Sequence, residues 1–308
     1  MPPYYGRPLH NARKKIELHP GLLAAAIALA GIISGAFLLR THTKPTLHEL
    51  VGRRVTSNGE DAPIQTIALS PDGKYLVYSD NNGAHLRSME TTDSRLLPET
   101  KGMSVEGWAT DDTQFFLSKP AGEQLDFYEM SLPAEAPQRL GDARPSPEGK
   151  YAIRQSNSQI EITRRSDGKA FTIDRKDASI VGTAWSPHDR RLAVVFGRPT
   201  DTGAPVRSWI ESLNGETGRW TTLVSPQPQY IAGAAWLSDR KVLYAKYEPT
   251  PRTDSNLWMV EVDPQSGAPL GPEKRRTQWA DFEIRSLSAG VDGARLCFFE
   301  GSIVRTCT

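Results

Sequence analysis

The chain has 308 residues, of which 38% are hydrophobic and 24% charged, so it is long and apolar enough to bury a large core. Its 37 Lys and Arg residues balance its 36 Asp and Glu residues, which gives no reason to expect a nucleic acid as partner. The 6 histidines form no i,i+4 pair, and no G-x-S-x-G elbow or phosphate-binding loop occurs. We therefore predict no catalytic residue, no metal or cofactor site, and a protein that is not an enzyme.

An uncharged apolar stretch near the N-terminus predicts one membrane-spanning helix. Residues 21–39 carry no charge, and at a helical rise of about 1.5 Å per residue they cross a hydrocarbon core of about 30 Å. The alternative is a cleavable signal peptide, but its apolar core is normally about 7–15 residues long and precedes a small-x-small site, which is missing here. We predict a short cytoplasmic segment at 1–20 and an uncleaved transmembrane helix at 21–40.

The charges around this helix predict its orientation. Basic residues are more numerous before the helix (Arg7, Arg13, Lys14, Lys15) than directly after it (Arg40, Lys44). The bias places the N-terminus in the cytoplasm and the rest of the chain in the periplasm, as a single-pass protein of a bacterial inner membrane. Gly31 and Gly35 have the small-xxx-small spacing that lets two helices dimerise, although Gly is also common in membrane helices, and we favour that simpler explanation.

Residues 41–62 are polar and lack a clear periodicity, which predicts a linker that also supplies a closing strand. From residue 63 to 308 one phrase returns six times, and its clearest copy begins Ser70-Pro71-Asp72-Gly73. The equivalent anchors are Pro71, Thr110, Pro147, Pro187, Ser238 and Val291. Their spacing is close to the period of about 40–50 residues that propeller blades show.

Each copy predicts a β-hairpin followed by further strands. The second strand starts after the turn and is mostly apolar at alternate positions, as at Leu76 and Tyr78 or Leu192 and Val194. A short segment rich in small residues precedes the turn, and the turn itself is rich in Asp, Gly and Asn. Third and fourth strands complete a four-stranded blade. A β-sandwich is the alternative, but a sandwich has no reason to repeat one phrase. We predict an all-β, six-bladed propeller over residues 63–308.

Several recurring residues are assigned structural rather than functional roles. Trp108, Trp185 and Trp236 each lie two residues before an anchor and are expected to pack between blades. Cys297 lies in a strand pattern and is expected to be buried rather than bonded to Cys307. The turns carry acidic residues that a reader could take for ligands, but their recurrence favours turn closure. These are Asp72, Asp111, Asp189, Asp239 and Asp292.

The segment from Ile67 to Gly83 resembles the opening blade of TolB-type propellers, which are built from WD40-like (PD40) repeats. Within that group it is similar to acidobacterial membrane-anchored proteins that join a cytoplasmic Ser/Thr kinase or winged-helix domain to a TolB-like propeller. The phrases at 54–58, 276–280 and 286–288 are also similar to that group. The resemblance implies the fold, but residues 1–20 are too short for either effector domain, so neither activity carries over.

The resemblance also makes the C-terminus unusual, because the relatives continue into a strand similar to Asp-Val-Tyr-Val. One permitted set of codons for residues 305–308 and the stop encodes Asp-Val-Tyr-Val when reading starts two bases later. We therefore hypothesise that a frameshift in the gene truncates the last blade. Sequencing the downstream DNA tests this. We expect Arg53–Thr56 to close a sixth blade made of 284–289, 295–299 and 302–306; an open arc is the alternative.

The sequence therefore predicts a membrane-anchored, non-enzymatic propeller that serves as a binding, scaffolding or sensory ectodomain. Its partner would be a protein, a peptide or a cell-wall-derived ligand held by propeller loops, including those at 197–207 and 248–255. One alternative is a remnant or trans-acting sensor half of a Ser/Thr kinase or transcriptional regulator. Another is the propeller of a prolyl-oligopeptidase-like peptidase that lacks its hydrolase domain.

Overall fold

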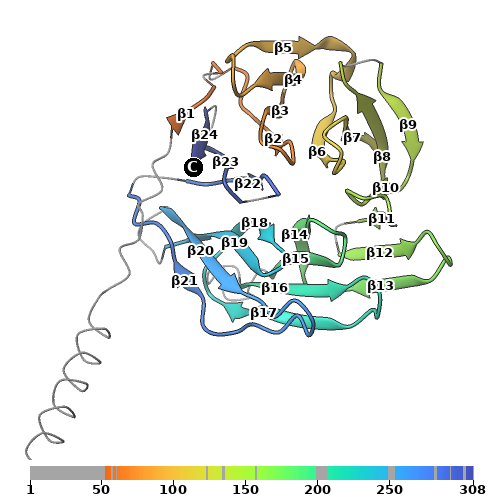
Figure 1. Ribbon diagram of the computed structural model, residues 1–308, viewed down its shortest axis with the longest axis vertical. Helices are drawn as coiled ribbons and strands as arrows, with labels where there is room; N and C mark the ends of the chain where they lie inside the picture. The colour runs from red at the N-terminus through yellow and green to blue at the C-terminus, as the bar shows by residue number, and fades with distance from the viewer. Residues whose placement is uncertain are drawn as a thin grey trace, which may run out of the picture. The chain divides into compact units, whose positions relative to one another are not determined.

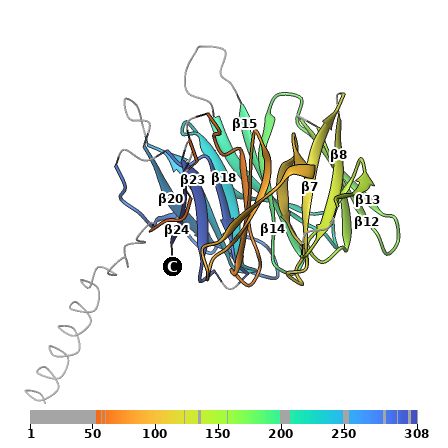
Figure 2. The ribbon, with the colours of Figure 1, turned by 90° about the horizontal axis from the view of Figure 1, so that it is seen from above.

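The computed structural model describes residues 53–308 apart from 57, 60, 123, 134–135, 157, 199–206, 249–253, 281–282, 292, 301–302 and 308. These residues belong to one of the chain's two units, Glu49–Thr308. They form six antiparallel sheets of four strands, set as blades around a central axis (Figure 1). In the view turned by 90°, the strands run from one face of the ring to the other (Figure 2). The predicted six-bladed propeller is confirmed.

The blades are numbered here in the chain order of their innermost strands. Blade 1 contains β2 (Thr66–Leu69), β3 (Tyr75–Asp80), β4 (Gly83–Ser88) and β5 (Ser94–Leu97), followed by the 3-10 helix η1 (Pro98–Thr100). Blade 2 contains β6 (Ser104–Trp108), β7 (Gln114–Ala121), β8 (Gln124–Ser131) and β9 (Gln138–Gly141). Blade 3 contains β10 (Arg144–Pro145), β11 (Tyr151–Gln155), β12 (Gln159–Arg164) and β13 (Ala170–Asp174).

The second half of the ring is built in the same way. Blade 4 contains β14 (Ser179–Trp185), β15 (Arg191–Arg198), β16 (Arg207–Asn214) and β17 (Trp220–Gln227). Blade 5 contains β18 (Ile231–Ser238), β19 (Lys241–Tyr247), β20 (Ser255–Glu261) and β21 (Lys274–Arg275). Blade 6 contains β22 (Ser286–Ala289), β23 (Leu296–Glu300) and β24 (Ile303–Cys307), with β1 (Arg53–Arg54) as its outermost strand.

The N-terminal strand closes the ring, as predicted, so the described residues do not form an open arc. β1 pairs antiparallel with β24, with Arg53 opposite Thr306. Beyond the strand, the Val55 amide donates to the Val304 carbonyl at 2.9 Å, and the Val304 amide donates to Thr56 Oγ1 at 2.9 Å. Closing a sheet on itself removes edges that would otherwise pair with another chain.

Hydrophobic clusters hold neighbouring blades together, and they are unevenly distributed. Among the described residues, separate clusters join blades 1 and 2, 3 and 4, 4 and 5, 5 and 6, and 6 and 1. The pair formed by blades 2 and 3 has no such cluster among the same residues. Within blade 3, Arg154 of β11 contacts Glu161 of β12 and Asp142 of the segment before β10 at 2.8 Å each.

The recurrent tryptophans lie between blades, as predicted. Trp108 Nε1 donates to the Ala68 carbonyl of blade 1 at 3.0 Å, and Trp236 Nε1 donates to the Ala184 carbonyl of blade 4 at 3.1 Å. Trp185 instead stacks on Tyr151 of blade 3, with ring centroids 5.1 Å apart. Cys297 is fully buried in the cluster between blades 6 and 1.

Several predictions concern residues that the structure does not describe. The segments 1–20 and 21–40 with Gly31 and Gly35, most of 41–62, Asp292, and most of the loops at 197–207 and 248–255 all lie outside the described residues. In the part of the chain that is described, no helix has the length and apolarity needed to cross a bilayer.

Candidate functional site

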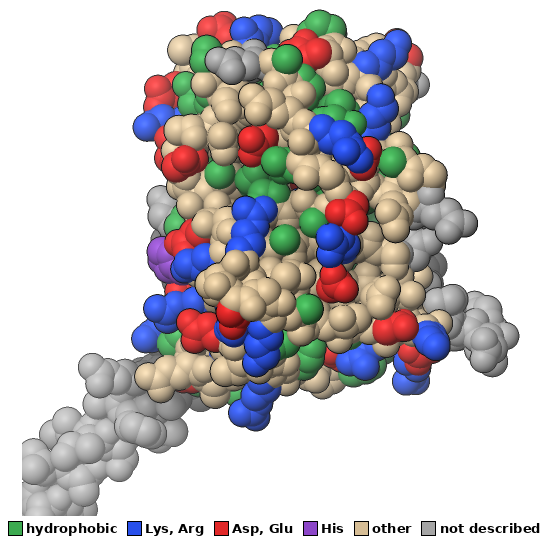
Figure 3. Space-filling view, turned by 90° about the vertical axis from the view of Figure 1, so that its right-hand side faces the viewer, with side chains coloured by type: hydrophobic (Ala, Val, Ile, Leu, Met, Phe, Trp, Pro, Cys, Tyr) green, Lys and Arg blue, Asp and Glu red, His purple; other side chains and the backbone are tan. Residues whose placement is uncertain are grey.

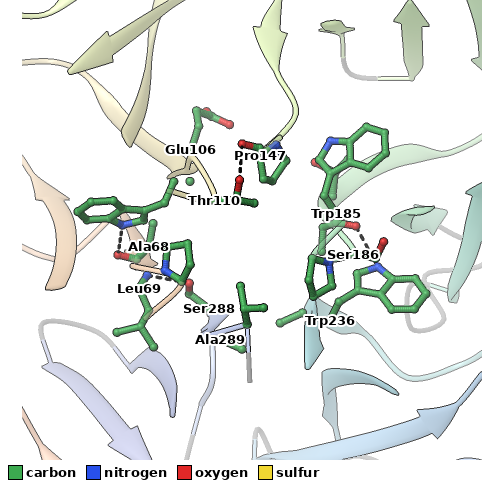
Figure 4. A pocket seen from close by; sticks show the side chains of 18 of the residues that line it. Ala68, Leu69, Glu106, Thr110, Pro147, Trp185, Ser186, Trp236, Ser288 and Ala289 are labelled. Carbon is green, nitrogen blue, oxygen red and sulfur yellow. Dashed lines mark hydrogen bonds between the residues drawn. The ribbon is translucent and has the colours of Figure 1, made fainter. Parts of the chain in front are cut away.

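The central channel holds a cavity of about 180 Å³ lined by the innermost strands and the turns that follow them (Figure 4). Innermost strands converge on the axis of a propeller, which leaves room there only for short side chains. Ala68 of β2, Ala234 and Ala235 of β18, and Ser288 and Ala289 of β22 line the cavity. The small residues that the sequence places in the first strands therefore form the channel wall.

One side of the channel carries charge. Glu106 of β6 and Arg144 of β10 are the charged residues of the described innermost strands, and both line the cavity. Arg144 Nε lies 3.8 Å from Glu106 Oε2, and Arg144 Nη2 donates to Thr183 Oγ1 at 2.7 Å. Glu106 also accepts a hydrogen bond from Ser118 Oγ at 2.6 Å. This cluster links blades 2, 3 and 4 across the channel wall.

Burial governs the electrostatics of the cluster. The side chain of Arg144 is 9% exposed, and its burial lowers the pKa of the guanidinium, while the charge of Glu106 acts in the opposite direction. A buried guanidinium with one carboxylate and one hydroxyl partner supplies fixed hydrogen-bond donors to the channel. The charged cluster gives the channel one polar wall and leaves the opposite wall small and apolar.

The channel opens at the face where the repeated turns lie. Pro71, Thr110, Pro187 and Val291 line both the cavity and an adjoining hollow of about 300 Å³. We call this hollow the mouth. Its other lining residues are three acids and one histidine, from four different turns. They are Asp72, Asp112, Glu148 and His188.

Two of the three mouth carboxylates have cationic neighbours. Asp72 lies 3.0 Å from Lys74 Nζ, and Glu148 contacts Lys150 Nζ and lies 3.1 Å from His188 Nδ1. Burial raises the pKa of both carboxyls, but hydrogen bonds and these cations outweigh it and leave each pKa below its usual value. Both Asp72 and Glu148 are therefore ionised at neutral pH.

Asp112 is the mouth carboxylate without a cation in contact, counting the described residues. It takes a left-handed backbone conformation with φ of 61°, and its Oδ1 accepts a hydrogen bond from the Asp72 amide at 2.9 Å. Burial, together with the nearby charge of Asp72, raises its pKa above the ordinary value of 3.8. A cation that entered the mouth would meet an uncompensated carboxylate here.

The acidic turn residues of the sequence have different roles in the structure. Asp72 Oδ1 and Asp111 Oδ1 accept hydrogen bonds from amides two residues on, at 2.9 and 3.1 Å, which is the predicted turn closure. Asp189 instead reaches the turn of blade 3, and Asp239 Oδ2 lies 4.0 Å from Arg190 Nε of blade 4. Their role is structural, but it joins neighbouring blades rather than closing single turns.

Sequence reasoning missed Glu106, Arg144 and Asp112. A signal for the first two existed, because they interrupt innermost strands that are otherwise small or apolar. Asp112 gave no such signal. It occupies a turn position that is Gly73 in blade 1 and Gly149 in blade 3, so it read as one more turn residue. No group of three or more His, Cys, Asp or Glu side chains able to hold a metal ion occurs in the described part of the chain.

Comparison with known proteins does not assign a family. No family model matches the chain. It is 24% identical over 204 residues to the mitochondrial 4-hydroxybenzoate polyprenyltransferase of Schizosaccharomyces pombe, covering 63% of this chain and 54% of that protein. Among solved structures it is similar to TolB from Acinetobacter baumannii, with a TM-score of 0.47, 16% identity, and coverage of 80% of this chain and 55% of the other. The chain thus spans about half the length of each protein, and the fold rests on its own strand pairing.

Proposed function

We propose that this propeller is a non-enzymatic binding module whose mouth takes a basic, extended peptide segment of a partner protein. The observation that carries the proposal is the set of carboxylates from separate turns around a hollow that leads into the channel. Asp112 supports it most, because it lacks a cationic partner among the described residues. Loops on a rigid propeller are where partners commonly bind. Its membrane anchor at 21–40 and its periplasmic location are part of the proposal and rest on the sequence.

The fit between a peptide and this mouth is electrostatic and steric. A Lys or Arg side chain has an apolar stem and a charged end. The stem matches the apolar mouth residues Pro71, Pro187 and Val291, while the charged end matches Asp112 and Asp72. Lys74 and Lys150 are more than half exposed, so they can turn into solvent when another cation arrives.

Replacing Asp112 by Asn is expected to weaken binding of a labelled pentalysine peptide by roughly threefold to fivefold, because an exposed ion pair contributes up to about 1 kcal/mol. Asn keeps the oxygen that accepts from the Asp72 amide, and it tolerates a positive φ, so the fold is retained. Fluorescence anisotropy at fixed ionic strength measures the affinity, with pentaglutamate as the negative probe.

The matched control is Asp174→Asn, which removes the same charge from an exposed position at the end of β13. The control variant is expected to bind pentalysine as the original chain does. Equal affinities for Asp112→Asn and Asp174→Asn would show that the mouth does not hold the peptide and would refute the proposal.

A further inference from the structure

A second hollow region follows the junction between blades 6 and 1, on the outer side of the ring. It consists of two adjoining hollows of about 270 and 690 Å³, which share Arg54, Val55 and Arg87. Arg53 and Arg295 line the first hollow as well. We call this region the arginine groove. Its arginines come from β1, from β4 and from the position just before β23, so ring closure brings them together (Figure 1).

The arginines of this groove are poorly compensated. Arg54 Nε donates to the Thr56 carbonyl at 2.8 Å, and Arg295 Nη1 donates to the Gly73 carbonyl, but neither contact involves a carboxylate. Arg53 and Arg87 make no ion pair or side-chain hydrogen bond within the described residues. Glu90 is the acidic residue that lines the groove. The groove therefore combines four guanidinium groups with one carboxylate.

Two arginines on another part of the ring are paired with carboxylates. On the outer side of blades 2 and 3, Arg139 lies 2.7 Å from Asp126, and Arg154 lies 2.8 Å from both Asp142 and Glu161. Figure 3 shows Lys and Arg side chains next to Asp and Glu side chains over this side of the molecule. The outer side of blades 2 and 3 thus pairs these arginines with acids, whereas the arginine groove has four guanidinium groups and one carboxylate.

A buried hydroxyl adds an unmet hydrogen-bonding group. Thr306 lines the same hollow as Arg53 and Arg87, and it is 8% exposed. Its Oγ1 is buried without a hydrogen-bond partner, which is uncommon for a buried polar atom. A hydroxyl can donate to an anionic oxygen while guanidinium groups donate to the others. Arginine forks and hydroxyls together are a usual donor set for phosphate oxygens.

We propose that the arginine groove binds a phosphate group, held by Arg53 and Arg87 with Thr306 as an additional donor. Such a group would join β1, the strand that closes the ring, to β4 of blade 1. Binding would therefore reinforce the junction at which the two ends of the propeller meet. The phosphate belongs either to a soluble phosphorylated molecule or to a lipid headgroup, and the two sources share this recognition chemistry.

The test uses the full chain and inorganic phosphate as the probe. Titration calorimetry at constant ionic strength, with chloride replacing phosphate, is expected to show saturable binding. Arg87→Gln is expected to weaken that binding roughly tenfold or more, because a hydrogen bond to a charged group is lost. Arg87→Lys keeps the charge but not the fork, and an intermediate affinity is expected. The control is Arg165→Gln, which removes the same charge from an exposed site in blade 3.

Two further measurements separate the sources and guard against misfolding. Calorimetric titration with a short-chain phosphatidylglycerol below its micelle concentration, for the original chain and for Arg87→Gln, avoids any effect of the proposed membrane anchor. Binding that Arg87→Gln weakens identifies a lipid headgroup as the source. Phosphate binding without phosphatidylglycerol binding identifies a soluble source. Hydrogen exchange at the Val55 amide, which donates to Val304, is expected to slow when phosphate is added. Phosphate binding that is absent, or equally weakened by Arg87→Gln and Arg165→Gln, would overturn the proposal.

Discussion

Replacing Phe115 by alanine is expected to lower the free energy of unfolding by about 3–5 kcal/mol, the range for a fully buried phenylalanine. Phe115 is 0% exposed and packs in the cluster between blades 1 and 2, with its ring centroid 5.4 Å from that of Trp108. The cavity left behind is enclosed by two blades that cannot collapse toward each other. Urea unfolding followed by tryptophan fluorescence measures the change.

The matched control is the next residue on the same strand. Phe116 is 5% exposed, points to the opposite face of blade 2, lines the channel cavity and belongs to none of the inter-blade clusters. Its replacement by alanine is expected to cost about 2 kcal/mol, because the space that it vacates is continuous with an existing cavity. If both variants lose the same free energy, the junction between blades 2 and 3 is as well packed as the others, contrary to our description.

Replacing Asp189 by alanine is expected to cost about 3 kcal/mol. Asp189 is 1% exposed, and its Oδ2 accepts hydrogen bonds from the Ser146 hydroxyl, from the Glu148 amide at 3.1 Å and from the Lys150 amide at 3.3 Å. Alanine leaves these donors of blade 3 unsatisfied, and at a φ of 53° it also adds backbone strain of about 1 kcal/mol. Thermal or urea unfolding measures the loss.

Asn at the same position is the informative comparison. It keeps an acceptor oxygen and tolerates the left-handed conformation, so Asp189→Asn is expected to lose about 1 kcal/mol or less. A loss as large as that of Asp189→Ala would show that the negative charge, rather than the hydrogen bonds, holds the turn of blade 3.

The stability difference between the original chain and Asp189→Asn is expected to depend on pH. Burial raises the pKa of Asp189 above the ordinary value of 3.8, more than its hydrogen bonds lower it. A group with a raised folded-state pKa contributes stability that is complete below the unfolded pKa and is lost as pH rises through the folded pKa. The free energy of unfolding of the original chain, relative to that of Asp189→Asn, should therefore fall as the pH rises above 3.8. Urea unfolding at a series of pH values measures this difference. A difference that does not change with pH would contradict a raised pKa for Asp189.

Much of the fold follows from the sequence because its signals are local. The Ser-Pro-Asp-Gly turn fixes each hairpin within a few residues, and the apolar alternation around Leu76 or Leu192 marks the strand after it. The closing strand was also predictable, since a sixth blade with three strands needs a fourth. In the structure only Arg53 and Arg54 pair as strand, while Val55 and Thr56 bond to Val304 in an irregular manner.

The sites were harder to predict because they depend on which blades become neighbours. Glu106 and Arg144 are far enough apart in sequence that no spacing rule joins them, although each is conspicuous in its own strand. The arginine groove joins Arg53, Arg87 and Arg295, and only closure of the ring brings them together. Asp189 looked like a turn residue, and its reach across to blade 3 depends on the left-handed conformation that it adopts.

The missing cluster between blades 2 and 3 has a mechanical consequence. The compliant joint is the junction between blades 2 and 3. Apolar clusters at the other five junctions resist movement of one blade against the next, so a closed ring deforms first at the compliant joint. The Glu106 and Arg144 side chains span the compliant joint at 3.8 Å, a separation longer than that of a direct hydrogen bond. Channel width is therefore expected to vary by rotation of blade 3 against blade 2, while the junction between blades 6 and 1 stays closed.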